Sequence, residues 1–113
     1  KKPVIISTGM ADIEDVSLAI KTLKKNGSTD IAILHCISAY PSKPNNYNLN
    51  FINKLKKFNF PVGLSDHTIG NIVAVSSIGM GVNIFEKHIK LDKQKGLDSG
   101  FSTNSSEFKN YVN

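Results

Sequence analysis

The chain has 113 residues, 40% of them apolar and 20% charged, which is typical of one soluble globular domain or a part of one. Its net charge of +5 comes from scattered lysines, so the sequence offers no arginine-rich or basic–aromatic patch for nucleic acid, and no apolar run approaches the roughly 20 residues of a membrane span. The single cysteine, Cys36, excludes an internal disulfide and suits a reducing compartment, so we expect a cytoplasmic protein.

The first half of the chain predicts two strands, each followed by a helix. The apolar run 4–9 leads into a helix that begins after Asp12, a plausible N-cap, and ends at Gly27. The second apolar strand covers 31–36. A polar loop then leads to a helix for which Asn48 is the expected N-cap.

The second half repeats the pattern. A third strand is predicted over 61–64, and the helix that follows over 70–79 is apolar on most sides and therefore expected to be buried. A fourth strand covers 82–86. A loop rich in Lys, Gly and Asp then leads to a fourth helix, capped by a serine or by Asn104.

The order βαβαβαβα predicts an α/β fold with a parallel sheet covered by helices. A small open doubly wound sheet fits this order, as does the C-terminal half of a TIM (β/α)8 barrel. We favour the half-barrel, because four strands alone leave two unpaired edges and an uncovered inner face. The chain also enters a strand at once, without an initiator Met. We therefore expect apolar side chains that face the missing half to be exposed.

Two histidines are the main candidates for chemistry. The carboxyl ends of parallel strands are where α/β folds bind ligands, and every predicted strand ends in polar residues. His67 and His88 are 88 − 67 = 21 residues apart, about one strand–helix repeat, so they are expected side by side. Two imidazoles suit an open site for a divalent ion such as manganese, with Asp66 or Glu86 orienting the rings.

Other polar residues near the strand ends have two interpretations each. Ser7, Ser38 and Ser65 could hold a phosphate or could serve as turn and cap residues. Tyr40 could line a pocket or pack its own loop, and Asp98 could reach a polyhydroxy ligand.

A cysteine–histidine catalytic pair is disfavoured by geometry. His35 and Cys36 are consecutive residues of one strand, so their side chains point to opposite faces. Cys36 is therefore expected to be a small buried residue.

Several motifs occur in order over essentially the whole chain: KPVIISTGM, LHCISAYP, GLSDHTIG, FEKHIKLD and GLDSGFS, followed by EF. Together they resemble the sialic acid synthase family, whose members make N-acetylneuraminate, legionaminate and pseudaminate. The resemblance implies that residues 1–113 are strands five to eight of a (β/α)8 barrel. It also implies that the first barrel half, with its phosphate-clamping lysines and carboxylate base, and a C-terminal antifreeze-like domain are absent. The full-length protein would be a homodimer, and this chain alone would be inactive.

The reaction implied by this resemblance condenses phosphoenolpyruvate with an N-acetylated hexosamine derivative in its aldehyde form. The product is a nine-carbon 2-keto sugar acid, and phosphate is released. A divalent metal, Mn²⁺ or else Mg²⁺ or Co²⁺, would polarise the sugar carbonyl. The resemblance assigns these residues: His67 and His88 to the metal and, with Glu86, to catalysis; Ser7, Ser38 and Ser65 to phosphoenolpyruvate; Tyr40, Glu86 and Asp98 to the sugar.

The branch of the family and two alternatives stay open. SAYP and GLDSGFS look closest to pseudaminate synthases, although Gly100 replaces an alanine and HC stands where that branch often has KC. Ser38 stands where the neuraminate branch often has Asn. One alternative is a non-catalytic half-barrel that acts as a binding or assembly module. The other is a barrel aldolase with a Schiff-base lysine, for which Lys87 is the candidate.

Overall fold

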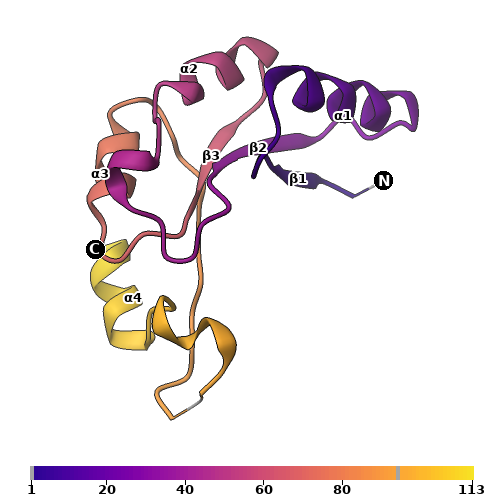
Figure 1. The fold of residues 1–113 in the computed structure, drawn as a ribbon. Helices are drawn as coiled ribbons and strands as arrows, with labels where there is room; N and C mark the ends of the chain where they lie inside the picture. Colours follow the sequence, from indigo (N-terminus) through magenta and orange to yellow (C-terminus); the bar gives the residue numbers. More distant parts are fainter. Residues whose placement is uncertain (1, 94) are drawn as a thin grey trace.

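The computed structural model describes residues 2–93 and 95–113. Strands and helices alternate in the order β1 (Val4–Ser7), α1 (Ile13–Lys25), β2 (Ile31–Cys36), α2 (Phe51–Leu55), β3 (Val62–Asp66), α3 (Ile72–Ile78), β4 (Phe85–Lys87) and α4 (Ser105–Val112). Short 3-10 turns occur at Pro44–Asn46, Lys56–Phe58 and Leu97–Gly100. The four strands are parallel and pair in chain order. The sheet curls into half a barrel with the helices on its outer side (Figure 1), which confirms the predicted fold.

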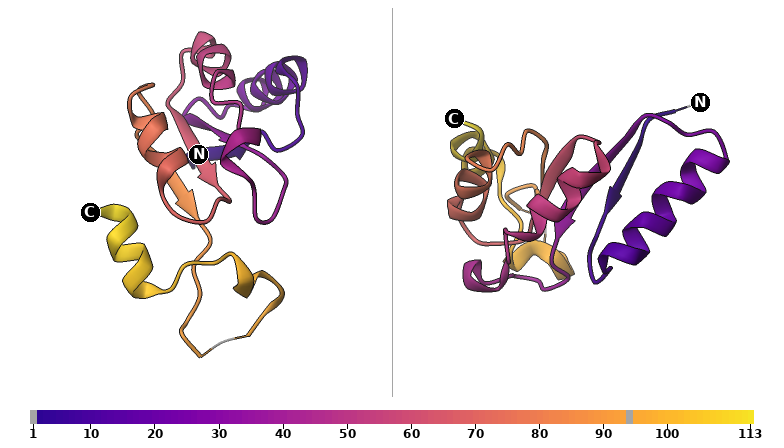
Figure 2. Two further views of the ribbon diagram at one scale, coloured as in Figure 1. Left: turned by 60° about the vertical axis from the view of Figure 1, so that its left-hand side comes forward. Right: turned by 90° about the horizontal axis from the view of Figure 1, so that it is seen from above.

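The hydrophobic core lies between the sheet and the helices. Ile33 of β2 and Leu64 of β3 are fully buried and pack with apolar residues of the first three helices. The buried members of this cluster are Val16, Ile20, Ile31, Ile33, Tyr47, Ile52, Leu55, Val62, Leu64, Val73, Ala74 and Val82. The sheet is curled, with the helices on its convex side (Figure 2). Because side chains alternate along a strand, the residues between these core positions face the other, inner side.

Two helix starts have the predicted caps. The Asp15 amide donates to the Asp12 carboxylate (2.8 Å), and the Asp12 amide donates to Asp15 (3.2 Å). Asn104 and Glu107 form the same reciprocal pair at the start of α4, with distances of 2.9 and 2.8 Å. Each pair satisfies two amides that the helix itself leaves without partners.

Three local predictions were wrong. Asn48 has a φ of 41° and lies in a turn, while α2 begins after Asn50. Helix α3 is not buried on most sides, because only the face carrying Val73, Ala74 and Ser77 packs on the sheet. Strand β4 begins at Phe85 rather than residue 82.

No helix in the described part of the chain is long and apolar enough to cross a membrane.

Candidate functional site

His67 and His88 converge at the carboxyl ends of β3 and β4. Their ring centroids are 5.3 Å apart, with the ring planes at 80°. Two nitrogens that bind one metal ion lie at most about 4.2 Å apart, because each bond is about 2.1 Å long. The observed ring separation is compatible with that limit. The structure therefore brings together the two imidazoles that the sequence pairs, while their metal role stays a prediction.

The environment of His67 fixes which ring nitrogen is available. His67 is buried, and its Nδ1 lies 2.8 Å from the carbonyl oxygen of Ile37. A carbonyl oxygen can only accept, so we assign the proton of the neutral ring to Nδ1 and the lone pair to Nε2. Nε2 lies 3.3 Å from the Ser65 hydroxyl oxygen on the inner side of the sheet.

His88 has an acidic partner instead of a carbonyl. Its Nδ1 lies 3.7 Å from Oδ2 of Asp98, and about a third of the His88 side chain is exposed. Asp98 comes from the loop after β4, within the 3-10 turn Leu97–Gly100. Asp98 thus has the position of an orienting partner for His88, a role that the sequence had offered to Asp66 or Glu86.

Two aromatic rings flank the histidine pair. The Tyr40 ring lies 4.2 Å from the His67 ring, and the Phe101 ring lies 5.2 Å from the His88 ring, measured between centroids. Tyr40 and Phe101 also contact each other at 5.4 Å. Tyr40 is a candidate from the sequence, whereas Phe101, inside the motif GLDSGFS, is not. No spacing rule marks a loop phenylalanine as part of a site.

Glu86 and Ser65 form a hydrogen bond across the two strands. They are partners in the β3–β4 register, and the Ser65 hydroxyl donates to Oε1 of Glu86 at 2.6 Å.

Cys36 is the register partner of Ser65 on the β2 side. Burial raises the pKa of the Cys36 thiol, which therefore stays protonated and is a poor nucleophile. His35, the residue before Cys36, packs against the Tyr47 ring on the helix side of the sheet. The prediction that the side chains of His35 and Cys36 point to opposite faces is therefore confirmed.

The three candidate serines come from the ends of three neighbouring strands. Ser7 pairs with Leu34, whereas Ser65 pairs with Cys36, so Ser7 lies two residues lower on the sheet. The Ser38 hydroxyl lies over Gly9, where an added Cβ would come within 3.2 Å of it. Within residues 2–93 and 95–113, no hydrogen bond joins Ser7 or Ser38 to Ser65. Their phosphoenolpyruvate role stays a prediction.

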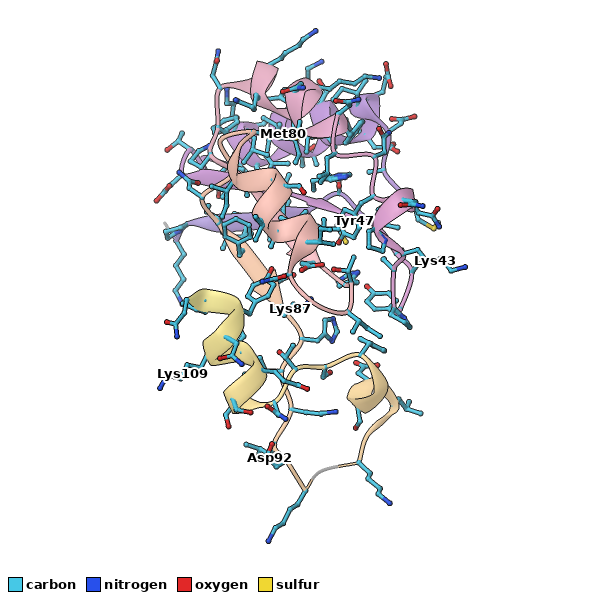
Figure 3. The ribbon with its side chains drawn as sticks, turned by 90° about the vertical axis from the view of Figure 1, so that its left-hand side faces the viewer. Lys43, Tyr47, Met80, Lys87, Asp92 and Lys109 are labelled. Atoms are coloured by element: carbon cyan, nitrogen blue, oxygen red, sulfur yellow. The ribbon has the colours of Figure 1, made fainter. Side chains whose placement is uncertain are left out.

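Asp66 and Lys87 lie on the opposite face from the histidines. Asp66 accepts hydrogen bonds from the Thr68 amide (2.8 Å), the Thr68 hydroxyl (2.7 Å), Lys87 Nζ (3.0 Å) and the Tyr111 hydroxyl (3.0 Å). The prediction that Asp66 could orient an imidazole is therefore wrong. Lys87 lies between α3 and α4 (Figure 3) and is not available to a ligand on the inner face. A Schiff-base role for Lys87 is wrong for the same reason.

The donor set of the site fits a divalent ion that also binds water or substrate. In the described ranges, no three side chains among His, Cys, Asp and Glu gather closely enough to hold a metal on their own. The Ser65 hydroxyl gives its proton to Glu86, so it has none left for the lone pair of neutral His67 at Nε2. A cation in front of Nε2 would satisfy this lone pair, and the remaining positions would need ligands from outside the chain.

A separate cavity of about 410 Å³ lies next to the site, between the start of α3 and α4. It is lined by Thr68, Lys90, Phe101, Glu107 and Tyr111, among others. His67 and His88 do not line it. Phe101 contacts both the cavity and His88.

Comparison with protein families and known sequences places this geometry in context. The NeuB family model matches residues 1–113. The protein MJ1065 of Methanocaldococcus jannaschii is 50% identical over 99% of this chain and 34% of its own length. The N,N'-diacetyllegionaminic acid synthase of Legionella pneumophila is 42% identical over 99% of the chain and 33% of its own length. The pseudaminic acid synthase of Campylobacter jejuni has the same identity and the same coverages.

Solved structures show the same fold. The spore coat polysaccharide biosynthesis protein SpsE of Bacillus subtilis matches 98% of the chain and 32% of its own, with a TM-score of 0.90 and 35% identity. The N-acetylneuraminic acid synthetase of Leptospira borgpetersenii, solved with citrate, matches 97% and 39%, with a TM-score of 0.89 and 35% identity. The chain thus spans about a third of the length of the curated relatives it matches.

Proposed function

This chain belongs to the NeuB family, and we propose that it supplies the metal-binding part of a synthase that joins phosphoenolpyruvate to an N-acetylated amino-sugar aldehyde. The product would be a nine-carbon 2-keto sugar acid. The observation that carries the proposal is the convergence of His67 and His88, with ring centroids 5.3 Å apart, at the carboxyl ends of two parallel strands. Two relatives that match 99% of this chain are named as synthases of N,N'-diacetyllegionaminic acid and pseudaminic acid.

The proposed reaction forms one carbon–carbon bond and replaces the bond from C2 to the phosphate oxygen by a bond from C2 to the oxygen of water. C3 of phosphoenolpyruvate bonds to the aldehyde carbon of the sugar, whose oxygen takes up a proton and becomes a hydroxyl. Water adds at C2, and the bond between C2 and the phosphate oxygen breaks. Inorganic phosphate leaves, and C2 becomes the keto carbon of the product.

A divalent ion, Mn²⁺ or else Mg²⁺ or Co²⁺, held by His67 and His88 would act as a Lewis acid toward the sugar carbonyl. The hydrogen bond from His67 Nδ1 to Ile37 keeps Nε2 directed at the inner face. Asp98, whose Oδ2 lies 3.7 Å from His88 Nδ1, would orient the ring of His88. Glu86, held by the Ser65 hydroxyl, presents its second oxygen to accept a hydrogen bond from a sugar hydroxyl or to hold a proton.

The remaining assignments concern substrate contacts. Ser7 and Ser38 would donate hydroxyl hydrogen bonds to phosphoenolpyruvate, and Ser65 would contact it once its hydroxyl turns from Glu86 to the ligand. Tyr40 and Asp98 would contact the sugar beside the histidines. A cytoplasmic location and a full-length homodimer belong to the same proposal.

For the sugar itself we favour the pseudaminate branch, with a 2,4-diacetamido trideoxy hexose as substrate. The argument is the motif pair SAYP and GLDSGFS. Sequence identity does not separate the branches, because the legionaminic and pseudaminic acid synthases are both 42% identical to this chain.

The test compares His67→Gln with His35→Gln in the intact natural protein. His35 lies on the helix side of the sheet and has no place in the proposed site. We expect His67→Gln to lower kcat/KM by about a hundredfold or more, because even outer partners of metal ligands are worth 10- to 100-fold. Chelation by EDTA should abolish the activity of the wild type and of His35→Gln, and added Mn²⁺ should restore both. Synthase activity that survives His67→Gln or EDTA would refute the metal role.

A further inference from the structure

The most enclosed charges near the site are Asp66 and Lys87, which lie directly behind the two histidines. Their carboxylate and ammonium groups are 3.0 Å apart, and the side chains are 0% and 1% exposed. Removing two charges from water costs several kcal/mol per ion, so a buried pair is weak evidence for stability alone. A contribution to stability therefore does not explain why this ion pair is buried behind the two histidines.

Every available hydrogen-bonding group of the pair is used. Asp66 accepts two bonds from Thr68 and one each from Lys87 and Tyr111. Lys87 also donates to the carbonyl oxygens of Thr68 and Gly70, the latter at 3.3 Å, and its Nζ lies 5.0 Å from the centre of the Tyr111 ring. Lys87 lies between α3 and α4 in Figure 3. The network therefore ties together the loop after β3, strand β4 and helix α4.

The pair also occupies a special register position. Asp66 and Lys87 are register partners, one residue beyond Ser65 and Glu86 and one residue before His67 and His88. Because side chains alternate, a pair fixed on the helix side determines where the next two side chains leave the sheet on the inner side. The two imidazoles are those next side chains.

A second contact holds the same stretch of β3 from the helix side. The Tyr47 hydroxyl donates to the Ser65 carbonyl and accepts from the His67 amide at 3.1 Å. Tyr47 is fully buried. The Tyr47 hydroxyl thus fixes the backbone on both sides of Asp66, next to His67. The backbone at His88 is held by Lys87 and by the hydrogen bond from the Thr103 amide to the His88 carbonyl (2.9 Å).

We propose that the Asp66–Lys87 pair, held by Thr68 and Tyr111, is a positioning device that sets the separation of the His67 and His88 rings. Its consequence for metal binding rests on the function proposed above. Neither residue touches the ligand side of the site, so both act only through the histidines. A purely structural pair would affect unfolding and leave the geometry of the folded site unchanged.

The test removes both charges together, so that no unpaired charge stays buried. Asp66→Asn/Lys87→Met keeps the bonds from Thr68 and the packing on Tyr111. Lys56→Met is the matched control, because Lys56 also donates to a carbonyl, that of Met80 (3.1 Å), but at an exposed position away from the site. In the intact protein, Co²⁺ is the probe, since its visible absorption reports coordination geometry. Crystal structures without metal report the ring positions.

We expect the double variant to keep its melting temperature within a few degrees. Its Co²⁺ affinity should fall about 10- to 100-fold with an altered spectrum, and the metal-free rings should move apart from the wild-type separation of 5.3 Å. Lys56→Met should match the wild type in all three measurements. If the double variant does not fold, Tyr111→Phe removes one bond to Asp66 and should give a smaller loss in the same direction.

Unchanged ring positions, spectrum and Co²⁺ affinity in the folded double variant would overturn the positioning role. A wild type that binds no Co²⁺ through His67 would refute the proposed metal function instead. In that case the metal-free crystal structures still decide the positioning role by themselves. Rings that stay in place in the double variant overturn it, and rings that move support it.

Discussion

Three histidines occur in this chain, and their surroundings give each a different chemistry. His35 Nε2 lies 2.6 Å from the Tyr47 carbonyl oxygen, so Nε2 must carry the proton of the neutral ring. Its Nδ1 is buried without a hydrogen-bond partner among the described residues. Burial lowers the pKa of His35 below its usual 6.5, against the opposing effect of the Tyr47 carbonyl. His35 is therefore a neutral packing residue on the helix side of the sheet, whereas His67 and His88 lie on the inner side.

This difference predicts a pH dependence of folding. Because the folded chain resists protonation of His35, the unfolded chain binds that proton first as the pH falls through about 6.5. The free energy of unfolding that this residue contributes is present above that pH and is lost progressively below it. Urea unfolding from pH 7.5 to 5 should therefore show a shallower loss in His35→Gln than in the wild type. Parallel curves would contradict this account.

At the scale of the element, β3 is the central strand of the site. It carries the core residue Leu64 toward the helices and Ser65 toward the inner face. Gly63, two residues before Ser65, faces inward as well, and the Leu34 side chain lies across it. A Cβ at residue 63 would lie 2.7 and 2.8 Å from the carbonyl oxygen and Cβ of Ile84. This close approach lets β2, β3 and the chain before β4 curl together.

Gly63→Ala should therefore destabilise the fold by about 1–3 kcal/mol, because the neighbouring atoms are backbone or packed side chain and cannot move away cheaply. Gly100→Ala is the matched control. An added Cβ at Gly100 meets nothing within 4 Å, so we expect a change within about 0.5 kcal/mol. Circular dichroism during urea unfolding measures both. Equal midpoints for the two variants would show that the close approach is not needed.

At the scale of the whole molecule, the inner face of the half-barrel is open. Ile5 of β1 is 60% exposed on that face, as expected for an apolar residue on the inner side of half a barrel. Leu34 on the same face is almost fully buried, because the curled sheet folds it over Gly63. The expectation of exposed inner apolar residues thus holds at the edge strand and fails in the centre.

This open face predicts that residues 1–113 alone lack synthase activity. The proposed synthase site would need groups on the opposite wall of a barrel to close it, and the chain covers about a third of the length of its relatives. Phosphate release from phosphoenolpyruvate plus N-acetylated sugar should stay at background. Ordinary turnover would contradict the prediction. A stable dimer in gel filtration would favour the alternative of a half-barrel that assembles with a second copy.

The sequence by itself determined the order of the elements, the cap at Asp12 and the pairing of His67 with His88, and it narrowed the cap of the last helix to a serine or Asn104. These features depend on spacing within one helix turn, one strand or one strand–helix repeat, which can be counted along the chain. The tertiary structure alone decided that Asp66 also bonds to Tyr111 and that Phe101 reaches His88. Those contacts join segments far apart along the chain, so their partners are set by packing in three dimensions rather than by spacing.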